Sequence, residues 1–198
     1  MSAHHQRQAI SEQGGQYRSP RANLAGVTLI ELIITLTIAT ILMTLAIPSF
    51  QGMVRTNRIA VLTNELSSAL QFARSEAITR GQTVTLCESD DVFDDTPSCN
   101  PASGKDWHLG WLVFVDDDND GVLDTGETLL LVGQPGIEAA TILTNSSAFS
   151  NKVVFSSDGQ SKGSGTIAIC IEPEERDLVI NFAGRLRLGE EEDKGKCP

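Results

Sequence analysis

The sequence predicts an α+β protein in which one long N-terminal helix is followed by a domain of antiparallel β-strands. Three observations support this: an almost uncharged apolar run at residues 27–47, a helix-spaced pattern that continues to Arg80, and short alternating runs after Gly81. The length of 198 residues is enough for one domain with its own core and one additional segment.

The apolar run at residues 27–47 contains a single ionisable side chain, that of Glu31. At about 1.5 Å per residue, a helix of this length spans about 31 Å, which matches the hydrocarbon core of a bilayer. The preceding residues are polar and net positive, so we expect the N-terminus to stay in the cytoplasm. An ordinary secretory signal fits poorly, because its apolar region is shorter and is followed by small residues, whereas Gly26 here precedes the run. We therefore predict a transmembrane helix at residues 27–47.

The stretch from Gly26 to Glu31 resembles the processing site of type IV prepilins and of type II secretion pseudopilins. The resemblance implies a prepilin leader at residues 1–26, cleavage after Gly26 by a prepilin peptidase, and N-methylation of Val27. Glu31 and Pro48 would then be the fifth and twenty-second mature residues, where pilins usually carry these residue types. A leader of 26 residues is long for the family. The implied protein has a single pass through the inner membrane and a periplasmic C-terminal domain, and it later enters a pilus or pseudopilus.

Glu31 is the one acidic side chain within the apolar run. A charged group inside hydrocarbon costs about 2.5–3.5 kcal/mol even on insertion scales, so such a residue usually has a partner. The resemblance to pilins implies that this partner is the new amino group of Val27 in a neighbouring subunit, which would set the axial register during assembly. The alternative is a protonated Glu31 near the headgroups in a plain membrane anchor.

Residues 48–81 are predicted to form the soluble half of the same helix. Pro48 lacks a backbone donor, so we expect a kink or local melting there. Beyond it, apolar residues recur at spacings of three or four and define one face of a helix: Ile59, Leu62, Leu66, Leu70, Ala73 and Ala77. Gly81 is expected to cap the C-terminal end.

Residues 82–198 are predicted to form the β domain, with its inner face packed on the second half of the helix. Turn residues separate seven short runs of apolar or β-branched residues, which we expect to be strands: Thr83–Cys87, Trp111–Val115, Thr128–Val132, Val153–Ser156, Thr166–Ile171, Leu178–Phe182 and Arg185–Leu188. This combination of a two-part helix and an antiparallel domain is the type IV pilin fold that the resemblance implies.

Several segments of the soluble part resemble the FimT/GspH branch of the pilin family in particular. They are Ala73-Arg74-Ser75-Glu76-Ala77, Val84-Thr85-Leu86-Cys87, Gly110-Trp111-Leu112-Val113-Phe114 and Phe155-Ser156-Ser157-Asp158-Gly159. The resemblance covers essentially the whole mature chain. It implies a minor pilin or a minor pseudopilin and not the abundant shaft subunit.

The four cysteines, Cys87, Cys99, Cys170 and Cys197, form no C-x-x-C pair, and the three histidines are not spaced with them as zinc ligands. In an exported domain, two disulfides are the natural interpretation. We favour Cys87–Cys99 and Cys170–Cys197, since both close local loops, although the sequence allows three pairings. The alternative is four reduced thiols in a cytosolic protein.

A candidate DNA-binding element lies at residues 184–187, with the sequence Gly-Arg-Leu-Arg. Strand alternation predicts Arg185 and Arg187 on one face and Leu186 and Leu188 on the other. Two adjacent guanidinium groups suit phosphate oxygens, and in the FimT family a G-R-x-R element near the C-terminus is associated with DNA binding in natural transformation. Against this, the chain has a net charge of −11, which repels phosphate over long range, and the acidic residues 190–193 follow closely. The alternative is an ordinary surface hairpin.

A candidate calcium site lies at residues 116–127, which fit the spacing D-x-[DN]-x-[DN]-G-x5-E. The predicted side-chain ligands are Asp116, Asp118, Asp120 and Glu127, with the Val122 carbonyl and Asp124 through water. The flanking segments are predicted strands, whereas an EF-hand has helices there. The alternative is an acidic hairpin turn that uses Asp and Gly for their backbone conformations.

The sequence contains no Ser/His/Asp set, phosphate loop or zinc motif, so we predict a protein without enzymatic activity and without catalytic residues. His108 is the only histidine in the mature chain and is expected to be structural or at the surface. The leading hypothesis is a minor type IV pilin that assembles into or primes a pilus and captures double-stranded DNA. The alternatives are a GspH-like minor pseudopilin of type II secretion and a membrane-anchored domain that never polymerises. Other pilin subunits, prepilin peptidase and the inner membrane are the expected partners.

Overall fold

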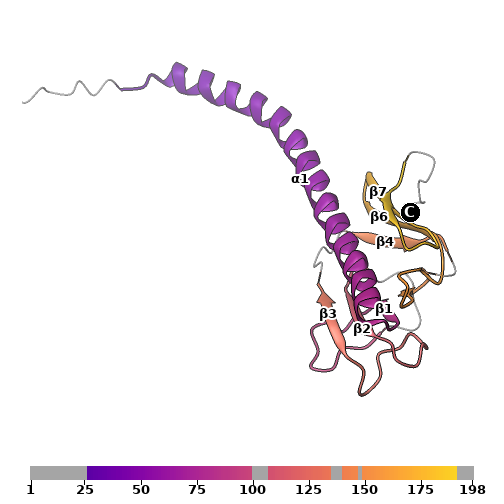
Figure 1. Ribbon diagram of the computed structural model, residues 1–198. Helices are drawn as coiled ribbons and strands as arrows, with labels where there is room; N and C mark the ends of the chain where they lie inside the picture. The colour runs from indigo at the N-terminus through magenta and orange to yellow at the C-terminus, as the bar shows by residue number, and fades with distance from the viewer. Residues whose placement is uncertain (1–25, 100–106, 135–139, 147–148, 191–198) are drawn as a thin grey trace, which may run out of the picture. The chain divides into compact units, whose positions relative to one another are not determined.

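The computed structural model describes residues 26–99, 107–134, 140–146 and 149–190 (Figure 1). Contacts between Cα atoms divide the chain into two compact units, residues 1–45 and residues 46–198. Helix α1, Leu29–Arg80, contributes to both units. All strands belong to the second unit, where every pairing is antiparallel. The predicted α+β class is confirmed.

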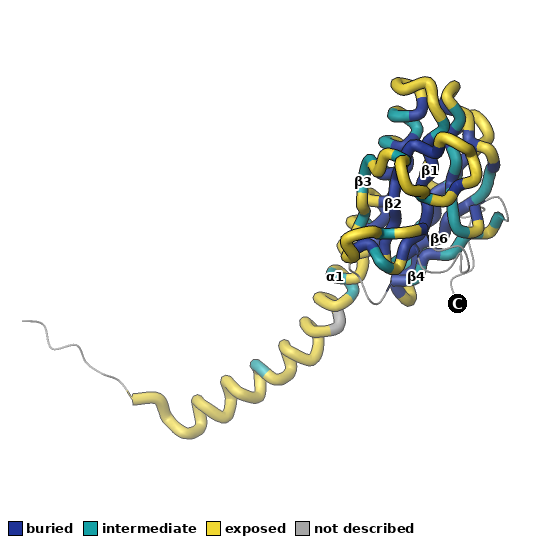
Figure 2. Tube along the Cα trace, turned by 90° about the horizontal axis from the view of Figure 1, so that it is seen from below, coloured by how far each residue is buried: buried dark blue, intermediate teal, exposed yellow. Residues whose placement is uncertain are grey.

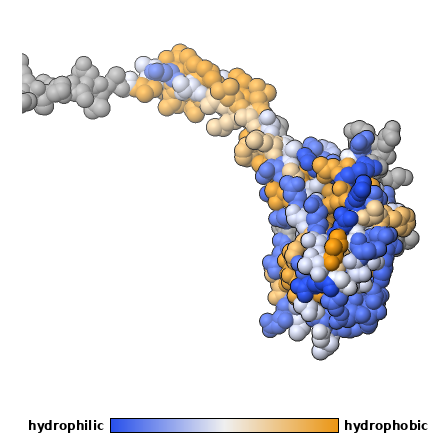
Figure 3. Space-filling model, viewed as in Figure 1, coloured by the Kyte–Doolittle hydropathy of each residue, from blue (hydrophilic) through white to orange (hydrophobic). Residues whose placement is uncertain are grey.

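In the first unit, the described part of α1 is an apolar helix whose large apolar side chains are exposed. Its large apolar residues are all more than half exposed, and the space-filling view shows an almost continuous apolar surface there (Figure 3). By length and composition, α1 meets the requirement for crossing a membrane, and none of the qualifying window is buried within the protein. A surface of this kind is unfavourable in water, so it requires lipid or a protein partner.

Side-chain and glycine caps define the two ends of α1. At the start, Thr28 precedes the first helical residue, and its hydroxyl accepts a hydrogen bond from the backbone N–H of Glu31 at 3.3 Å. At the end, Gly81 adopts φ +67° and its N–H donates to the carbonyl of Ala77 at 2.9 Å, as predicted for a C-terminal cap. The helix is uninterrupted at Pro48, so the local melting considered from the sequence is wrong. The missing donor removes one bond from a ladder that continues on both sides.

The second unit contains two four-stranded sheets. One has the order β3-β2-β1-β5 and the other the order β4-β6-β7-β8. The strands are β1 Val84–Glu88, β2 Trp111–Val115, β3 Leu129–Gly133, β4 Thr141–Thr144, β5 Lys152–Phe155, β6 Gly165–Ile171, β7 Glu174–Ile180 and β8 Leu186–Leu188. All seven predicted strands are present, with bounds that shift by a few residues.

Two strands differ from the prediction. Strand β4 was not expected, because its four residues carry a weak local signal and gain strand geometry by pairing with β6. Strand β7 begins at Glu174, four residues earlier than predicted, since the charged residues at its start pair with the end of β6. It also ends at Ile180, and the predicted strand residue Phe182 lies in the following turn.

One hydrophobic core joins the second half of α1 to both sheets. All six residues of the predicted apolar helix face are buried, with relative exposures of 0–1%. They pack with inward-facing side chains of the first sheet, such as Leu86 and Val113, and of the second sheet, such as Ile167 and Ile180. The buried residues concentrate along β1, β2 and β6 (Figure 2). The expected packing of the β domain on the helix is therefore confirmed.

The first sheet is covered on its second face as well. Strands β1 and β2 are buried at all five positions, which is unusual for antiparallel strands with one solvated face. A second cluster on this face combines Cys87, Leu112 and Phe114 with Val92 and Cys99 from residues 89–99, which we call the cover loop. The cover loop and the outer face of the first sheet therefore form a second, smaller hydrophobic core.

Candidate functional site

The predicted processing and assembly residues lie at the start of α1. Gly26 and Val27 precede the helix and are exposed, and Glu31 is exposed in its first turn. The Thr28 cap was missed in the sequence, although the T-x-x-E spacing of Thr28 and Glu31 is the known signature of a capping box. The cap satisfies the backbone N–H of Glu31, while the Glu31 side chain remains exposed.

The predicted DNA-binding arginines lie at the end of the tight turn that connects β7 to β8 and in the first residues of β8. We call residues 181–187 the basic turn. The N–H of Gly184 donates to the carbonyl of Asn181 at 2.8 Å, and the N–H of Arg185 donates to the Asn181 side chain at 2.9 Å. Gly184 adopts φ +68°, and a Cβ there would lie 2.1 Å from the carbonyl oxygen of Gly159. Both the backbone conformation and the lack of space thus require glycine immediately before the two arginines.

Arg74 of α1 fixes the basic turn to the rest of the second unit. Its Nε donates to the carbonyl of Gly159 at 2.9 Å, and its Nη2 donates to the carbonyl of Ala183 at 3.1 Å. One guanidinium therefore connects the helix to two turns. No local pattern indicates this role, because the partners are 85 and 109 residues away along the chain.

Arg185 and Arg187 are both exposed, whereas Leu186 between them is half-buried and packs against the core. The predicted alternation therefore applies to these three residues. Leu188 lies beyond the edge of the core and is 57% exposed, so it does not share the burial of Leu186. Phe182, in the same turn, is 62% exposed and was not recognised as part of this surface.

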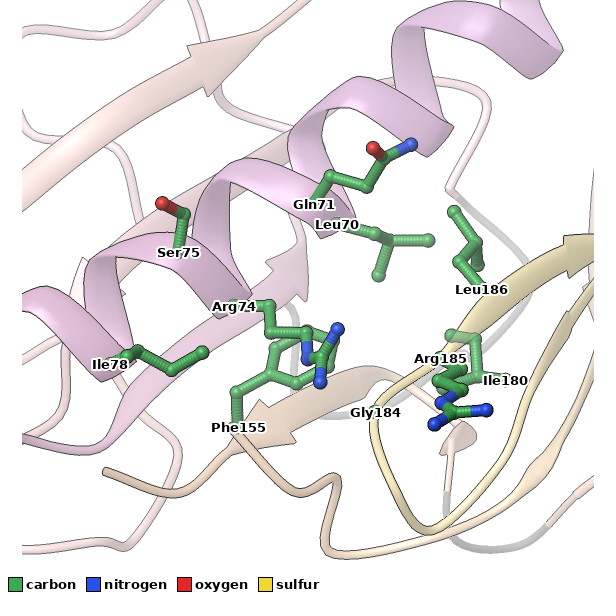
Figure 4. Close-up of a pocket in the computed structure, with 10 residues that line it drawn as sticks. All are labelled: Leu70, Gln71, Arg74, Ser75, Ile78, Phe155, Ile180, Gly184, Arg185 and Leu186. Carbon is green, nitrogen blue, oxygen red and sulfur yellow. The ribbon is translucent and has the colours of Figure 1, made fainter. Parts of the chain in front are cut away.

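A groove of about 470 Å³ lies beside the basic turn. Its walls come from α1, at Gln71 and Arg74, and from residues of the turn that include Gly184 and Arg185. Figure 4 shows the guanidinium of Arg74 beside the ring of Phe155, with Arg185 on the strand side of the groove. The arrangement offers exposed positive charge beside a partly apolar surface.

The predicted calcium ligands lie in the loop between β2 and β3, which we call the acidic loop (residues 116–127). Carboxylate oxygens of Asp116, Asp118 and Asp120 all lie within 4.8 Å of one another. Glu127 is not part of this group. Its two oxygens accept hydrogen bonds from the N–H groups of Asp117 at 2.9 Å and Asp124 at 3.0 Å, and so close the base of the loop. The structure thus brings together three of the four predicted side-chain ligands.

The cover loop is attached by the predicted Cys87–Cys99 disulfide, which is present with an S–S distance of 2.02 Å. Cys170 is also disulfide-bonded, while its predicted partner Cys197 lies outside the described residues. Within the cover loop, the carboxylate of Asp91 accepts hydrogen bonds from Ser89 and from the N–H and hydroxyl of Ser98. Burial raises the pKa of Asp91, but these hydrogen bonds outweigh burial and leave the pKa below its ordinary value.

His108 is half-buried at the start of the segment leading into β2, next to the fully buried Trp107. The acidic residues 190–193, which argue against DNA binding by the nearby arginines, follow β8. Glu190 is exposed, and residues 191–193 lie outside the described part of the chain.

Comparison with known protein families identifies the chain. The model of the family described as type II transport protein GspH matches residues 62–184, which is more than half of the chain. The chain belongs to the GspH family. The prokaryotic N-terminal methylation motif matches residues 21–47, which include Gly26, Val27 and Glu31.

One solved structure supports the type IV pilin fold. A crystal structure of the type IV minor pilin FimU from Pseudomonas aeruginosa PAO1 is 22% identical, with a TM-score of 0.50, and the match covers 68% of this chain and 90% of that one. A second crystal form of FimU gives 23% identity and a TM-score of 0.46, covering 64% and 89%. No curated protein matches significantly. At this identity the comparison establishes the type IV pilin fold of this GspH-family chain.

Membership of the GspH family, together with the methylation motif, implies that the chain is a pilin or pseudopilin that is processed by a prepilin peptidase and assembles with other pilins. The family consists of structural subunits and not of enzymes. The apolar first part of α1 is consistent with membrane anchoring before assembly.

Proposed function

We propose that this chain is a minor subunit of a type IV pilus, cleaved after Gly26, methylated at Val27 and held in the inner membrane by residues 27–47, with residues 82–198 in the periplasm. The observation that carries the proposal is the match to the methylation motif at the start of an exposed apolar helix. Such a surface is satisfied first by lipid and then by the helices of other subunits in a filament.

Within this proposal, Glu31 pairs with the α-amino group of Val27 in a neighbouring subunit. The methylated amino group keeps its positive charge, so an ion pair with Glu31 compensates for removing the carboxylate from water. The exposure of Glu31 supports the proposal, because the side chain is accessible to another subunit. We assign Pro48 to assembly as well, because it would be the twenty-second mature residue, a position at which pilins usually carry proline.

The assembly role is tested by comparing Glu31→Ala and Glu31→Gln with Glu65→Ala, which removes an exposed acid from the other half of the same helix. We expect all three variants to be inserted and cleaved, and the two Glu31 variants to be absent from sheared filaments. Mass spectrometry of the wild type gives the cleavage site and the methyl group. Normal incorporation of Glu31→Ala into filaments would refute the assembly role.

We propose further that Arg185 and Arg187 bind the phosphates of double-stranded DNA during natural transformation. Support comes from the exposure of both side chains and from the rigid support of the turn by Gly184 and Arg74. Holding the turn in one conformation lowers the entropy that would be lost on binding. Two phosphate contacts are weak by themselves and salt-sensitive, so repeated copies along a filament would provide the avidity.

The DNA proposal is tested with the full-length chain in detergent micelles and a duplex probe, over a range of salt concentrations. Arg185→Gln/Arg187→Gln is expected to weaken binding about tenfold at low salt and to reduce the salt slope by about 1.8, because each phosphate contact contributes about 0.9. Arg55→Gln/Arg58→Gln removes the same charge from exposed helix positions and is the matched control. Equal binding by all forms, or by none, would overturn the proposal.

The second candidate function is that of a minor pseudopilin in type II secretion, which the description of the matching family favours. This role would use the same helix and the same assembly contacts, but it requires no DNA binding. Deletion of the gene, with transformation, twitching and secretion scored together, separates the two functions. Loss of secretion alone would replace the pilus proposal with the secretion role.

A further inference from the structure

The acidic loop carries six carboxylates in twelve residues, and it runs from the end of β2 to the start of β3. The N–H of Asp116 donates to the carbonyl of Thr83 at 3.0 Å, and the N–H of Val115 donates to the carbonyl of Thr128 at 3.0 Å. The two accepting residues immediately precede β1 and β3, so these bonds fix the start of the loop beside both strands. Within the loop, the carboxylate of Asp118 accepts the N–H of Asp120 at 3.2 Å, and the carboxylate of Asp120 accepts the N–H of Val122 at 2.7 Å. These bonds hold both side chains near Asp116.

Asp116 is the residue that distinguishes this loop from an ordinary acidic turn. Its side chain is only 1% exposed. Oδ2 accepts a hydrogen bond from the hydroxyl of Thr85 at 2.6 Å, whereas Oδ1 is buried and has no partner. A buried carboxylate oxygen without a partner is strongly unfavourable, because it has lost its water and gained nothing in exchange.

Two lysines contact the acidic loop, but neither forms an ion pair with the three carboxylates. Among the described residues, no lysine or arginine lies within ion-pair distance of Asp116, Asp118 or Asp120. The two nearby lysines contact uncharged oxygens instead: Lys162 donates to Oδ1 of Asn119 at 3.2 Å, and Lys152 donates to the carbonyl of Asp120. Three like charges thus lie within 4.8 Å, and one of them is buried.

We propose that the acidic loop binds one calcium ion through the carboxylates of Asp116, Asp118 and Asp120. A hard divalent cation among these oxygens would provide the missing partner of Asp116 Oδ1 and remove the repulsion between the side chains. Calcium suits the loop better than magnesium, because it accepts six to eight oxygens in flexible geometry and sheds its water more readily. The Val122 carbonyl, Asp124 through water, and Glu127 complete the spacing of a twelve-residue calcium loop.

The Glu127 carboxylate has a different role when no ion is bound, because both of its oxygens accept backbone N–H groups. Direct coordination by Glu127 requires its carboxylate to move toward the three aspartates, because it lies outside their group, and so to release the N–H groups of Asp117 and Asp124. The three aspartates are therefore the essential ligands in this proposal, and Glu127 contributes by closing the loop or by joining the ion after that release.

Calorimetric titration of calcium chloride into the full-length chain in non-ionic detergent tests the proposal. We expect one ion per chain, with a dissociation constant of about 10⁻⁴–10⁻³ M, the range of extracellular calcium modules. A parallel thermal unfolding experiment should show a rise in Tm with calcium chloride and a smaller rise with the same concentration of magnesium chloride.

Two substitutions identify the ligands. Asp116→Asn and Asp118→Asn should each weaken calcium binding at least about tenfold, because each removes a charged ligand. Asp117→Asn is the matched control: it removes the same charge from the same loop at an exposed position outside the three-carboxylate group, and it should weaken binding less than about threefold. Asp118 is exposed, so its variant decides the question if Asp116→Asn does not fold. No calcium uptake at millimolar concentration, equal uptake by all variants, or equal stabilisation by magnesium would overturn the proposal.

Discussion

The acidic loop and the basic turn each contain a glycine with positive φ, but they differ in how far their charged side chains are exposed. Both place a glycine with positive φ beside charged residues, Gly121 at +76° in the loop and Gly184 at +68° in the turn. In the basic turn, the two arginine side chains are exposed, so water and salt screen their like charges. In the acidic loop, three carboxylates are held together and one of them is buried.

This difference indicates how each region should respond to its surroundings. The basic turn needs no ligand for its stability, because its two arginine side chains are exposed and its backbone is held by Arg74. The acidic loop has an unsatisfied buried oxygen, so its stability should depend on a bound cation. Four substitutions test this contrast, beginning with the one of largest expected effect.

Gly184→Ala should be the most destabilising of the four. The new Cβ would combine a strained φ with a contact of 2.1 Å to the Gly159 carbonyl, and we expect a loss of roughly 4 kcal/mol in unfolding free energy. Gly81→Ala is the matched control, with φ +67° and nothing within 4 Å of the new Cβ, so it should cost about 1–2 kcal/mol. Denaturant unfolding measures both values. Equal losses would show that the close approach to Gly159 is unimportant.

Replacing both cysteines of the Cys87–Cys99 bridge with alanine should cost about 3 kcal/mol, through the freedom gained by a loop of 12 residues. The bridge fastens the cover loop over the outer face of the first sheet, next to the acidic loop and not to the basic turn. Hydrogen exchange should therefore speed up in residues 89–99 and leave residues 181–187 unchanged. Faster exchange in the basic turn would contradict this separation of the two regions.

Asp116→Asn should raise stability by about 1 kcal/mol in metal-free buffer, because it removes one of three adjacent charges and supplies a donor to its neighbours. With calcium present, the order should reverse, since the wild type gains the bound ion and the variant does not. Thermal unfolding with chelator and with calcium measures both conditions. A variant less stable than the wild type in chelator would show that the buried charge is already compensated.

Asp91→Asn should change the free energy of unfolding least of the four. It should lower the stability, whereas Asp116→Asn raises it in metal-free buffer, because the Asp91 carboxylate is satisfied by Ser89 and Ser98. The pKa of Asp91 in the folded chain is lowered, so the charged form contributes stability above the ordinary aspartate pKa near 4. That contribution is lost as the pH falls through the lower folded pKa. The difference between the wild type and Asp91→Asn should thus be present at neutral pH and shrink in acid. A constant difference across this range would refute the assignment.

The local features of the protein were predictable from its sequence. Periodicity predicted the helix up to Arg80 and the strands that carry β-branched and apolar residues, and the Gly26–Glu31 stretch was by itself enough to indicate the pilin family. The Cys87–Cys99 pairing was also accessible, because a bridge between nearby cysteines closes a short loop. Each of these signals lies in residues that are close together along the chain.

The tertiary structure alone decided the features that depend on distant contacts. One such feature is the division of the strands into two sheets. Another is the attachment of Arg74 to Gly159 and Ala183, the second of which is 109 residues away along the chain. A third is the hydrogen bond between the buried Asp116 and Thr85, which are 31 residues apart. The sequence determined which residues could carry charge and where the chain could turn. Tertiary packing determined which of those charged side chains remain hydrated. Hydration depends on the segments that cover each side chain, and no local sequence pattern specifies those segments.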